Sequence, residues 1–261
     1  MKVITLLNEK GGVGKTTLST HIAAGLALSG YRVILVDADA QGNATSALSA
    51  PKDPALYNLL VRGAAWRDCV VEVHPDIYTV AGQTNGGRLF VVSSNTETIS
   101  IAMHIKNTTL RKRLAELHES FDYVVFDTAP TPSLFQEAVA IASDYIIIPT
   151  ELESFSALEG LPDSLLHLEN ARTAMAERGL AVSRIVGIIP SKMRDTQMHK
   201  NILAHLHDTY AELVWAPVKQ AVIYSEAQAA RKLLYAVAPD AKATASMWNI
   251  VQRIIAIPAE A

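Results

Sequence analysis

The sequence has only one cysteine, Cys69, in its 261 residues. A single thiol cannot form a disulfide within the chain. It also cannot supply the group of thiolates that a cysteine-ligated zinc site or an iron–sulfur cluster needs. The cysteine content therefore argues against a disulfide-stapled secreted domain and against an iron–sulfur carrier, and it fits the reducing cytoplasm.

Long apolar runs are also missing. No stretch approaches the roughly 18 consecutive apolar residues of a membrane-spanning helix. The apolar stretch at residues 3–7 is too short for the hydrophobic region of a signal peptide, and it runs into charged residues. We therefore expect a soluble cytoplasmic protein that has no membrane partner.

An excess of basic residues is lacking too. Lys and Arg number 23 against 26 Asp and Glu, which gives a net charge of −3 and is unlike a strongly basic nucleic-acid-binding protein. The charge is uneven along the chain. Residues 1–170 hold 12 basic and 19 acidic residues, and residues 171–261 hold 11 and 7. Any contact with a polyanion is therefore expected toward the C-terminus.

Short apolar runs alternate with segments of helical spacing along most of the chain. The runs, which predict buried strands, are residues 3–7, 32–37, 123–127, 144–149 and 184–190. The helix-like segments are residues 16–29, 107–119, 133–142, 157–178, 196–209 and 243–257. This alternation predicts an α/β fold, a mostly parallel sheet with helices on both faces. The length suits one domain over residues 1–261, and residues 50–105 give no clear elements.

Residues 10–17 read Lys-Gly-Gly-Val-Gly-Lys-Thr-Thr, between an expected strand and an expected helix. This is the context of a phosphate-binding loop, in which glycines let backbone N–H groups turn toward phosphates. Lys15 is expected to neutralise the β- and γ-phosphates of ATP, and the hydroxyl of Thr16 to bind Mg²⁺. The expected nucleotide-binding residues are Gly11, Gly12, Val13, Gly14, Lys15, Thr16 and Thr17.

Carboxylates stand at the ends of two other expected strands. Asp37 ends one strand and Asp39 follows it, while Asp127 ends another. Ligands bind beyond the carboxyl ends of the strands in open α/β sheets, so we expect these residues beside the phosphate loop. The Asp127 carboxylate is expected to hold Mg²⁺ through water.

These motifs resemble the ParA/MinD class of partition ATPases with a deviant Walker A motif, closest to ParA/Soj-like chromosome and plasmid partition proteins. The octet carries that class's early lysine at Lys10, and residues 37–45 match its pattern D-x-D-x-Q-G-N-x-T. The resemblance implies a P-loop ATPase domain and an ATP-bound homodimer in which Lys10 reaches the partner's nucleotide. It also implies that Asp39 positions the attacking water, and that Asp37 supports the Mg²⁺ shell with Thr16 and Asp127.

By the same resemblance, the expected function is slow, Mg²⁺-dependent ATP hydrolysis that a ParB-like adaptor stimulates. The ATP-bound dimer is expected to bind DNA without sequence preference, to associate with the nucleoid, and to segregate or position a plasmid, chromosome or other cargo. The family's two usual arginines near residues 218–224 are replaced by Gln220 and Ile223. DNA contacts would then fall to Lys192, Arg194, Lys219, Arg231 and Lys232.

Two other functions are compatible with the motifs. One is a MinD-like positioning ATPase acting on a membrane or a protein scaffold, although the C-terminal tail lacks a basic amphipathic helix. The other is a small-molecule synthetase of the same fold, such as dethiobiotin synthetase, which generally lacks the early lysine and the second motif. No histidines have metal-ligand spacing, and His199, His205 and His207 are expected on an exposed helix.

Overall fold

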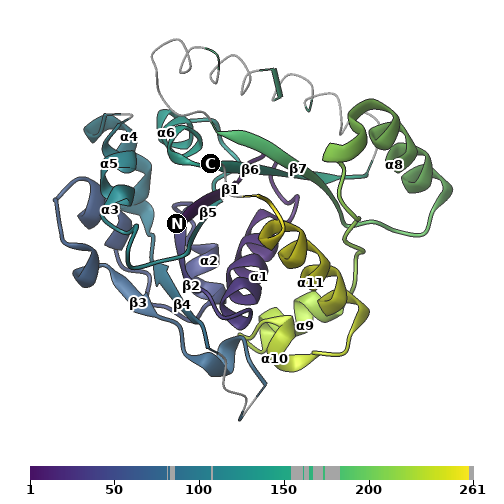
Figure 1. Cartoon of the computed structure of the whole chain (residues 1–261), viewed down its shortest axis with the longest axis horizontal. Coiled ribbons are helices and arrows are strands. Elements are labelled where there is room, and N and C mark those ends of the chain that lie inside the picture. The colour runs from purple at the N-terminus through teal and green to yellow at the C-terminus, as the bar shows by residue number, and fades with distance from the viewer. Residues whose placement is uncertain are drawn as a thin grey trace.

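The computed structural model describes residues 1–80, 82, 86–106, 108–153, 161, 165–166, 173 and 183–258. Seven strands of these residues form one sheet in the order β3-β4-β2-β5-β1-β6-β7 (Figure 1). Their bounds are β1 Lys2–Leu6, β2 Arg32–Ala38, β3 Val70–Glu72, β4 Arg88–Val92, β5 Tyr123–Thr128, β6 Tyr145–Glu151 and β7 Arg184–Ser191. All neighbouring strands pair in parallel except the edge strand β3, which is antiparallel to β4.

Helices cover both faces of the sheet (Figure 1). They are α1 Lys15–Leu28, α2 Asn43–Ala47, α3 Ala55–Leu60, α4 Ile101–His104, α5 Thr109–Ala115, α6 Leu134–Ala142, α8 Gln197–Tyr210, α9 Ile223–Ala229, α10 Leu234–Val237 and α11 Lys242–Ile255. Short 3-10 turns occupy Trp66–Asp68, Pro75–Ile77, Thr96–Ser100 and Ala211–Leu213. The expected three-layer P-loop arrangement of helix, mostly parallel sheet and helix is confirmed.

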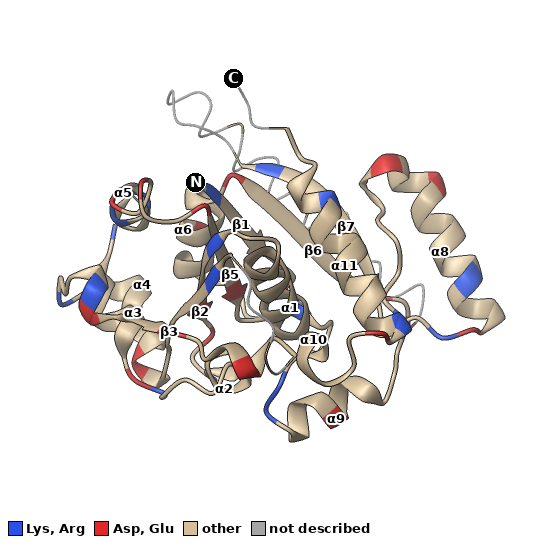
Figure 2. Cartoon of the chain, turned by 60° about the horizontal axis from the view of Figure 1, so that its bottom comes forward, with Lys and Arg blue, Asp and Glu red and all other residues tan. Residues whose placement is uncertain are grey.

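Alternate residues of one strand enter different cores, because successive side chains of a strand point to opposite faces. Val33 and Leu35 of β2 pack with α1 and α11. Ile34 and Val36 pack with α3, α5 and α6 on the other side. Charged residues of both signs lie on peripheral elements such as α8, whereas α1, between the sheet and α11, is mostly uncharged (Figure 2). Both faces of the central strands are therefore buried, which explains their continuous apolar runs.

The helix that follows the phosphate loop is held tightly in this core. Most residues of α1 are buried, including Leu18, Ile22 and Leu26, so the helix is packed on nearly all sides. A Cβ placed on Gly25 would lie 2.5 Å from Cγ2 of Val251 and 2.7 Å from Oη of Tyr235. Glycine is thus what allows α1 to approach α10 and α11 closely, and this packing fixes the position of the loop.

Most expected elements are present with small shifts at their ends. The helix expected at residues 107–119 is shorter, since α5 covers Thr109–Ala115. The helix expected at residues 157–178 lies almost wholly outside the described residues. Within residues 50–105, where no elements were clear, the sheet gains β3 and β4. Among the residues that the structure describes, no helix combines the length and apolarity needed to cross a membrane.

Candidate functional site

The loop between β1 and α1 lies at the carboxyl end of the sheet, as the motif predicts. Gly12 and Gly14 have φ angles of +78° and +89°, a left-handed conformation that glycine adopts without the penalty of a Cβ. Val13 between them is buried, which anchors the loop. The chain then enters α1 at Lys15, so that the loop stands at a helix N-terminus, where anions are favoured.

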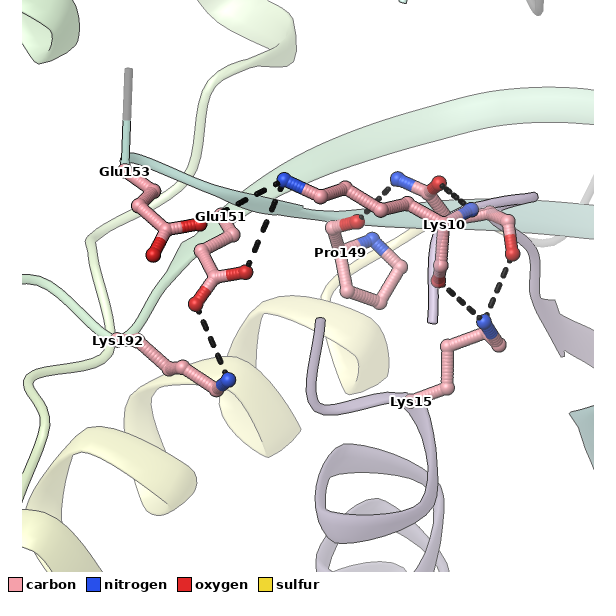
Figure 3. A network of polar contacts seen from close by, with 7 residues as sticks. Lys10, Lys15, Pro149, Glu151, Glu153 and Lys192 are labelled. Carbon is pink, nitrogen blue, oxygen red and sulfur yellow. Dashed lines mark hydrogen bonds and ion pairs between the residues drawn. The ribbon is translucent and has the colours of Figure 1, made fainter. Parts of the chain in front are cut away.

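The ammonium group of Lys15 is held inside this loop. The side chain is buried, and Nζ donates to the backbone oxygens of Asn8 at 2.7 Å and Lys10 at 3.0 Å (Figure 3). Burial lowers the pKa of Lys15, against the opposing effect of the carboxylates of Asp127 and Asp39. A buried ammonium with only neutral carbonyl partners is well suited to bind phosphate oxygens, since hydrogen bonds between charged groups are stronger.

Asp127 joins the loop to the end of β5. It is fully buried, and its Oδ2 accepts a hydrogen bond from Oγ1 of Thr16 at 2.7 Å. Its other oxygen, Oδ1, is buried and has no hydrogen-bond partner among the described residues. Burial, together with the smaller effect of the neighbouring Asp37 carboxylate, raises the pKa of Asp127 to about 7. Such an unpaired buried carboxylate oxygen calls for a cation or a donor.

These groups fit Mg²⁺. Magnesium takes oxygen ligands and is usually held by one or two carboxylates together with waters and phosphate oxygens. Asp127 Oδ1 and the hydroxyl of Thr16 supply such oxygens beside the phosphate loop. Within the described part of the chain, no group of three or more His, Cys, Asp or Glu is placed to hold a metal ion. The donors therefore suit a metal shared with phosphates rather than a cage of protein ligands.

Asp37 has a different environment from its cross-strand neighbour Asp127. Its Oδ2 accepts hydrogen bonds from both the backbone N and Oγ1 of Thr45, each at 2.7 Å, and its Oδ1 accepts one from the backbone N of Asp39 at 3.2 Å. Burial raises the pKa of Asp37, although these hydrogen bonds act in the opposite direction. Because its oxygens are already engaged, Asp37 supports the site by holding the segment that carries Asp39.

Asp39 lies just past the end of β2. Its Oδ1 accepts a hydrogen bond from the backbone N of Gln41 at 2.9 Å, and its backbone oxygen accepts one from Oγ of Ser94 at 2.5 Å. The carboxylate acts electrostatically on Lys15, whose pKa it raises. The structure therefore brings Asp39, Lys15, Thr16 and Asp127 to one place, as the sequence predicts.

A second charged cluster lies on the outer side of the loop. Lys10 Nζ is 3.9 Å from a carboxylate oxygen of Glu151 and 3.9 Å from one of Glu153. Glu151 also pairs with Lys192, whose Nζ is 3.0 Å from Oε1 (Figure 3). Asn8 positions the loop by donating to the backbone oxygen of Pro149 at 2.7 Å. Asn8 and Glu151 were not identified as site residues from the sequence. Asn8 lies between β1 and the phosphate loop, and Glu151 ends β6, so their positions could have indicated a place near the site.

A cavity of about 530 Å³ extends from the start of α1 toward the C-terminal third, within the size range of small-ligand sites. Its lining includes Gly14, Thr16 and Thr17 from the phosphate loop and the start of α1, and Gln220, Ala221 and Tyr224 from the C-terminal third. Four of the five basic residues expected to contact DNA also line it: Lys192, Lys219, Arg231 and Lys232. The fifth, Arg194, donates from Nε to Oε1 of Gln220 at 2.6 Å.

Two residues of this region differ from what the sequence indicated. Ser191, which was not singled out, ends β7 and lines the cavity. It is buried, and its Oγ has no hydrogen-bond partner among the residues described. The exposure expected for His199 is wrong. His199 is buried in α8, and its Nδ1 accepts a hydrogen bond from the backbone N of Arg194 at 3.1 Å. The first turn of α8 packs on the segment after β7, and sequence spacing does not reveal such a contact.

The family model and the named relatives that match this chain agree on one family. A family model described as an AAA domain matches residues 1–181. The chromosome-partitioning ATPase Soj of Thermus thermophilus is 31% identical, over 99% of this chain and 97% of that protein. The sporulation initiation inhibitor protein Soj of Bacillus subtilis is 36% identical over 63% of each chain. An uncharacterized Pseudomonas putida protein is 34% identical over 62% of this chain. The chain spans less than two thirds of the length of the latter two relatives, 63% and 60%.

Solved structures share the fold. The ATP complex of McdA from Cyanothece has a TM-score of 0.79 and 22% identity, covering 100% of this chain and 98% of that one. Cobyrinic acid a,c-diamide synthase from Mycobacterium smegmatis, with bound ADP and magnesium, has a TM-score of 0.76 and 20% identity, covering 97% and 94%. The nucleotides and the metal of these structures match the ATP and Mg²⁺ that the sequence predicts.

Proposed function

Since the chain belongs to the ParA/MinD-type family of partition ATPases, we propose that it is a Mg²⁺-dependent ATPase whose ATP-bound form dimerises. The observation that carries this proposal is the grouping of Lys15, Thr16, Asp39 and Asp127 around one phosphate loop, with the Lys15 ammonium enclosed and Oδ1 of Asp127 unpaired. Phosphoryl transfer depends mainly on positioning and charge stabilisation, and these side chains offer both.

Each residue has a role that follows from its contacts. Lys15 exchanges two backbone carbonyls for phosphate oxygens. Thr16 and Asp127 hold Mg²⁺, which when bound neutralises charge on the phosphates. Asp39, close to Lys15, positions the attacking water, while Asp37 holds the segment around Asp39. With one carboxylate on the water, we expect slow turnover that a partner protein raises.

ATP acts as a switch through Lys10. This lysine is exposed at the edge of the loop, with a side-chain exposure of 43%, and its weak 3.9 Å ion pairs leave it able to move. In the ATP-bound homodimer, Lys10 contacts the nucleotide of the other subunit. The whole chain, residues 1–261, acts as one ATPase domain, because α11 packs against the helix that carries the loop.

The dimer binds DNA without sequence preference and thereby associates with the nucleoid in the cytoplasm. A ParB-like adaptor stimulates hydrolysis. The same adaptor links the ATPase to a plasmid, chromosome or other cargo. Of the five basic residues expected to contact DNA, Lys192 lies next to the phosphate loop. The basic groups for DNA come from the other four, Arg194, Lys219, Arg231 and Lys232. A membrane-cycling role is less well supported, because Met247, Ile250, Val251 and Ile254 of α11 are buried against the core rather than free to enter a lipid surface.

The test is to measure phosphate release and molar mass by light scattering without nucleotide, with ADP and with ATP, each with and without Mg²⁺. The wild type should hydrolyse ATP slowly, only with Mg²⁺, and should shift from monomer to dimer with ATP. Lys15→Ala should lose nucleotide binding and both responses. Mg²⁺-independent hydrolysis, or hydrolysis that survives Lys15→Ala, would contradict the proposal.

A further inference from the structure

Lys192 occupies an unusual backbone position at the end of β7. Its φ angle is +52°, in the left-handed region that residues other than glycine, asparagine and aspartate seldom adopt. Hydrogen bonds fix the backbone on both sides of it. The N–H of Val218 donates to the oxygen of Pro190 at 2.8 Å, and the N–H of Met193 donates to the oxygen of Val218 at 3.0 Å. The turn is therefore rigid, and it sets the direction of the Lys192 side chain.

That direction is toward the phosphate loop. A Cβ placed on Gly12 would lie 3.8 Å from Nζ of Lys192, and one placed on Gly14 would lie 4.0 Å from Cβ of Ser191. Both Ser191 and Lys192 line the cavity together with Thr16 and Thr17. The end of β7 thus contributes two polar side chains to the wall of the cavity next to the loop.

Among the residues that the structure describes, neither polar side chain has a full set of partners. Oγ of Ser191 is buried with no hydrogen-bond partner, and the residue is 4% exposed. Lys192 has an ion pair with Glu151 at 3.0 Å, but Glu151 also faces Lys10 (Figure 3). The Glu151 carboxylate is therefore shared between two ammonium groups, of which Lys10 also faces Glu153 at 3.9 Å. With 45% of its side chain exposed, Lys192 gains little from this pair and can leave it at small cost.

We propose that Lys192 is a second phosphate-binding lysine of the same subunit, which exchanges the Glu151 carboxylate for phosphate oxygens of a nucleotide in the loop, with Ser191 Oγ as a neighbouring donor. This assignment rests on the proposed nucleotide binding. A lysine ammonium is a compact charge with three donors, which suits oxygens of varying position. The negative charge on a nucleoside diphosphate exceeds that of one shared carboxylate, so the exchange is favourable. Lys192 thereby serves the nucleotide rather than DNA.

Lys192 and Lys10 then differ in the subunit on which they act. Lys10 serves the nucleotide of the partner, so it affects ATP-bound dimers. Lys192 serves its own subunit, so it contributes to binding of ADP by the monomer. Glu151 competes with the nucleotide for Lys192, and neutralising Glu151 should strengthen ADP binding.

The experiment is calorimetric titration of the full-length chain with ADP and Mg²⁺. Lys192→Asn removes the charge while keeping a residue that tolerates the left-handed backbone; it should weaken ADP binding about 10-fold or more, the effect of losing a hydrogen bond between charged groups. Lys192→Arg should recover most of the affinity. Lys200→Asn, which removes the same charge from an exposed position on α8, is the matched control and should bind normally.

Glu151→Gln gives an independent measurement that does not alter the strained turn. It should tighten ADP binding severalfold, and this gain should vanish in the double variant with Lys192→Asn. Wild-type affinity for ADP in Lys192→Asn, or no gain in ADP affinity in Glu151→Gln, would overturn the assignment of Lys192. The proposed function would still stand if Lys15→Ala loses ADP binding. Failure of the wild type to bind ADP would overturn both.

Discussion

The hydroxyl of Thr16 donates to the carboxylate of Asp127 across 2.7 Å, and this bond connects the first turn of α1 to the carboxyl end of β5. The other oxygen of Asp127, Oδ1, is buried and has no hydrogen-bond partner in the part of the chain that the structure describes. An unsatisfied buried polar group costs roughly 1–3 kcal/mol, and more when it is charged. The site thus contains a group that destabilises the fold unless a cation or a proton joins it.

Replacing Asp127 by asparagine should therefore stabilise the nucleotide-free protein in a pH-dependent manner. The pKa of Asp127 is raised to about 7 from an ordinary value of 3.8. The native state retains a proton that the unfolded state releases, so the stability that Asp127 contributes is present below about pH 4 and is lost as the pH rises to about 7. Asp127→Asn should unfold at a higher temperature than the wild type at pH 8, by about 2–4 °C for each kcal/mol recovered, and the advantage should shrink at pH 5.

Thermal unfolding without Mg²⁺ and nucleotide measures this difference. Asp208→Asn, at an exposed position of α8, controls for the general loss of a negative charge. Binding of Mg²⁺ with ADP should be weaker in Asp127→Asn, although its fold is more stable. If Asp127→Asn lowered the unfolding temperature equally at pH 5 and pH 8, ionisation of Asp127 would not be what destabilises the folded state.

Asp39→Asn should separate nucleotide binding from turnover. The amide retains an oxygen that can accept from the backbone N of Gln41, as Oδ1 of Asp39 does at 2.9 Å, so the local structure is kept. It lacks the negative charge needed to position and activate water, and the loss of such a group lowers rates about 100-fold or more. Single-turnover phosphate release measures the rate, and calorimetry measures the affinity. Hydrolysis at the wild-type rate would remove Asp39 from the mechanism.

Lys10→Ala should bind nucleotide as a monomer but fail to dimerise. Within the described part of the chain, the ion pairs of the Lys10 side chain are those with Glu151 and Glu153 at 3.9 Å, which are worth little at a partly exposed position. Its removal should leave the stability of the monomer unchanged. Light scattering with saturating ATP should show a dimer for Asp39→Asn and a monomer for the double variant with Lys10→Ala. A dimer of unchanged stability in the double variant would contradict the sandwich arrangement.

Gly25→Ala should weaken the packing that holds the loop in place. The added Cβ would lie 2.5 Å from Cγ2 of Val251, and overpacking of a tight core costs about 1–3 kcal/mol. Gly86→Ala is the matched control, because a Cβ there meets nothing within 4 Å. Denaturant unfolding should show a lower stability for Gly25→Ala and none of this loss for Gly86→Ala. Equal stabilities would mean that α1 and α11 can move apart freely.

The sequence predicts the central part of the fold and the phosphate site because both rest on local patterns. The apolar run of β1, the glycines at Gly12 and Gly14 and the spacing of α1 are adjacent in the chain, and each has a strong local preference. Asp37 and Asp127 follow from the rule that the carboxyl ends of parallel strands meet at one edge. The predicted residues of the loop and the two aspartates therefore lie together in the structure.

Other features depend on contacts between distant segments, which a single sequence does not encode in a readable form. Strand β4 follows Gly87, which packs against backbone atoms of Ala27 and Tyr31; the run Arg88–Val92 alone does not identify an interior strand. The left-handed turn at Lys192 is held by Val218, 26 positions later. The same turn brings Lys192 to the loop, so its place in the site could not be predicted.

Basic residues of the C-terminal third are expected to bind DNA in the ATP-bound state. Arg231 and Lys219 lie on the cavity wall in the basic C-terminal third, and Lys219 makes an exposed ion pair with Asp195 at 2.9 Å. Phosphate contacts dominate nonspecific DNA binding, and affinity falls with added salt in proportion to their number. The ATP-bound wild type should shift a random-sequence duplex at low salt. Lys219→Glu and Arg231→Glu should each weaken the shift and flatten its dependence on salt, whereas Lys112→Glu on α5 should change little.

Dimerisation explains why this binding should require ATP. A monomer offers only one set of these basic groups, and the protein as a whole carries a net charge of −3, so a single set gains little against general repulsion. Two sets joined in one dimer roughly double the number of phosphates contacted, and the salt dependence of log affinity doubles with it. Apo and ADP states should therefore bind weakly, and Lys10→Ala should bind weakly even with ATP. An equal shift in all nucleotide states would separate DNA binding from the switch, and no shift at micromolar protein would favour a protein scaffold as the surface on which this ATPase acts.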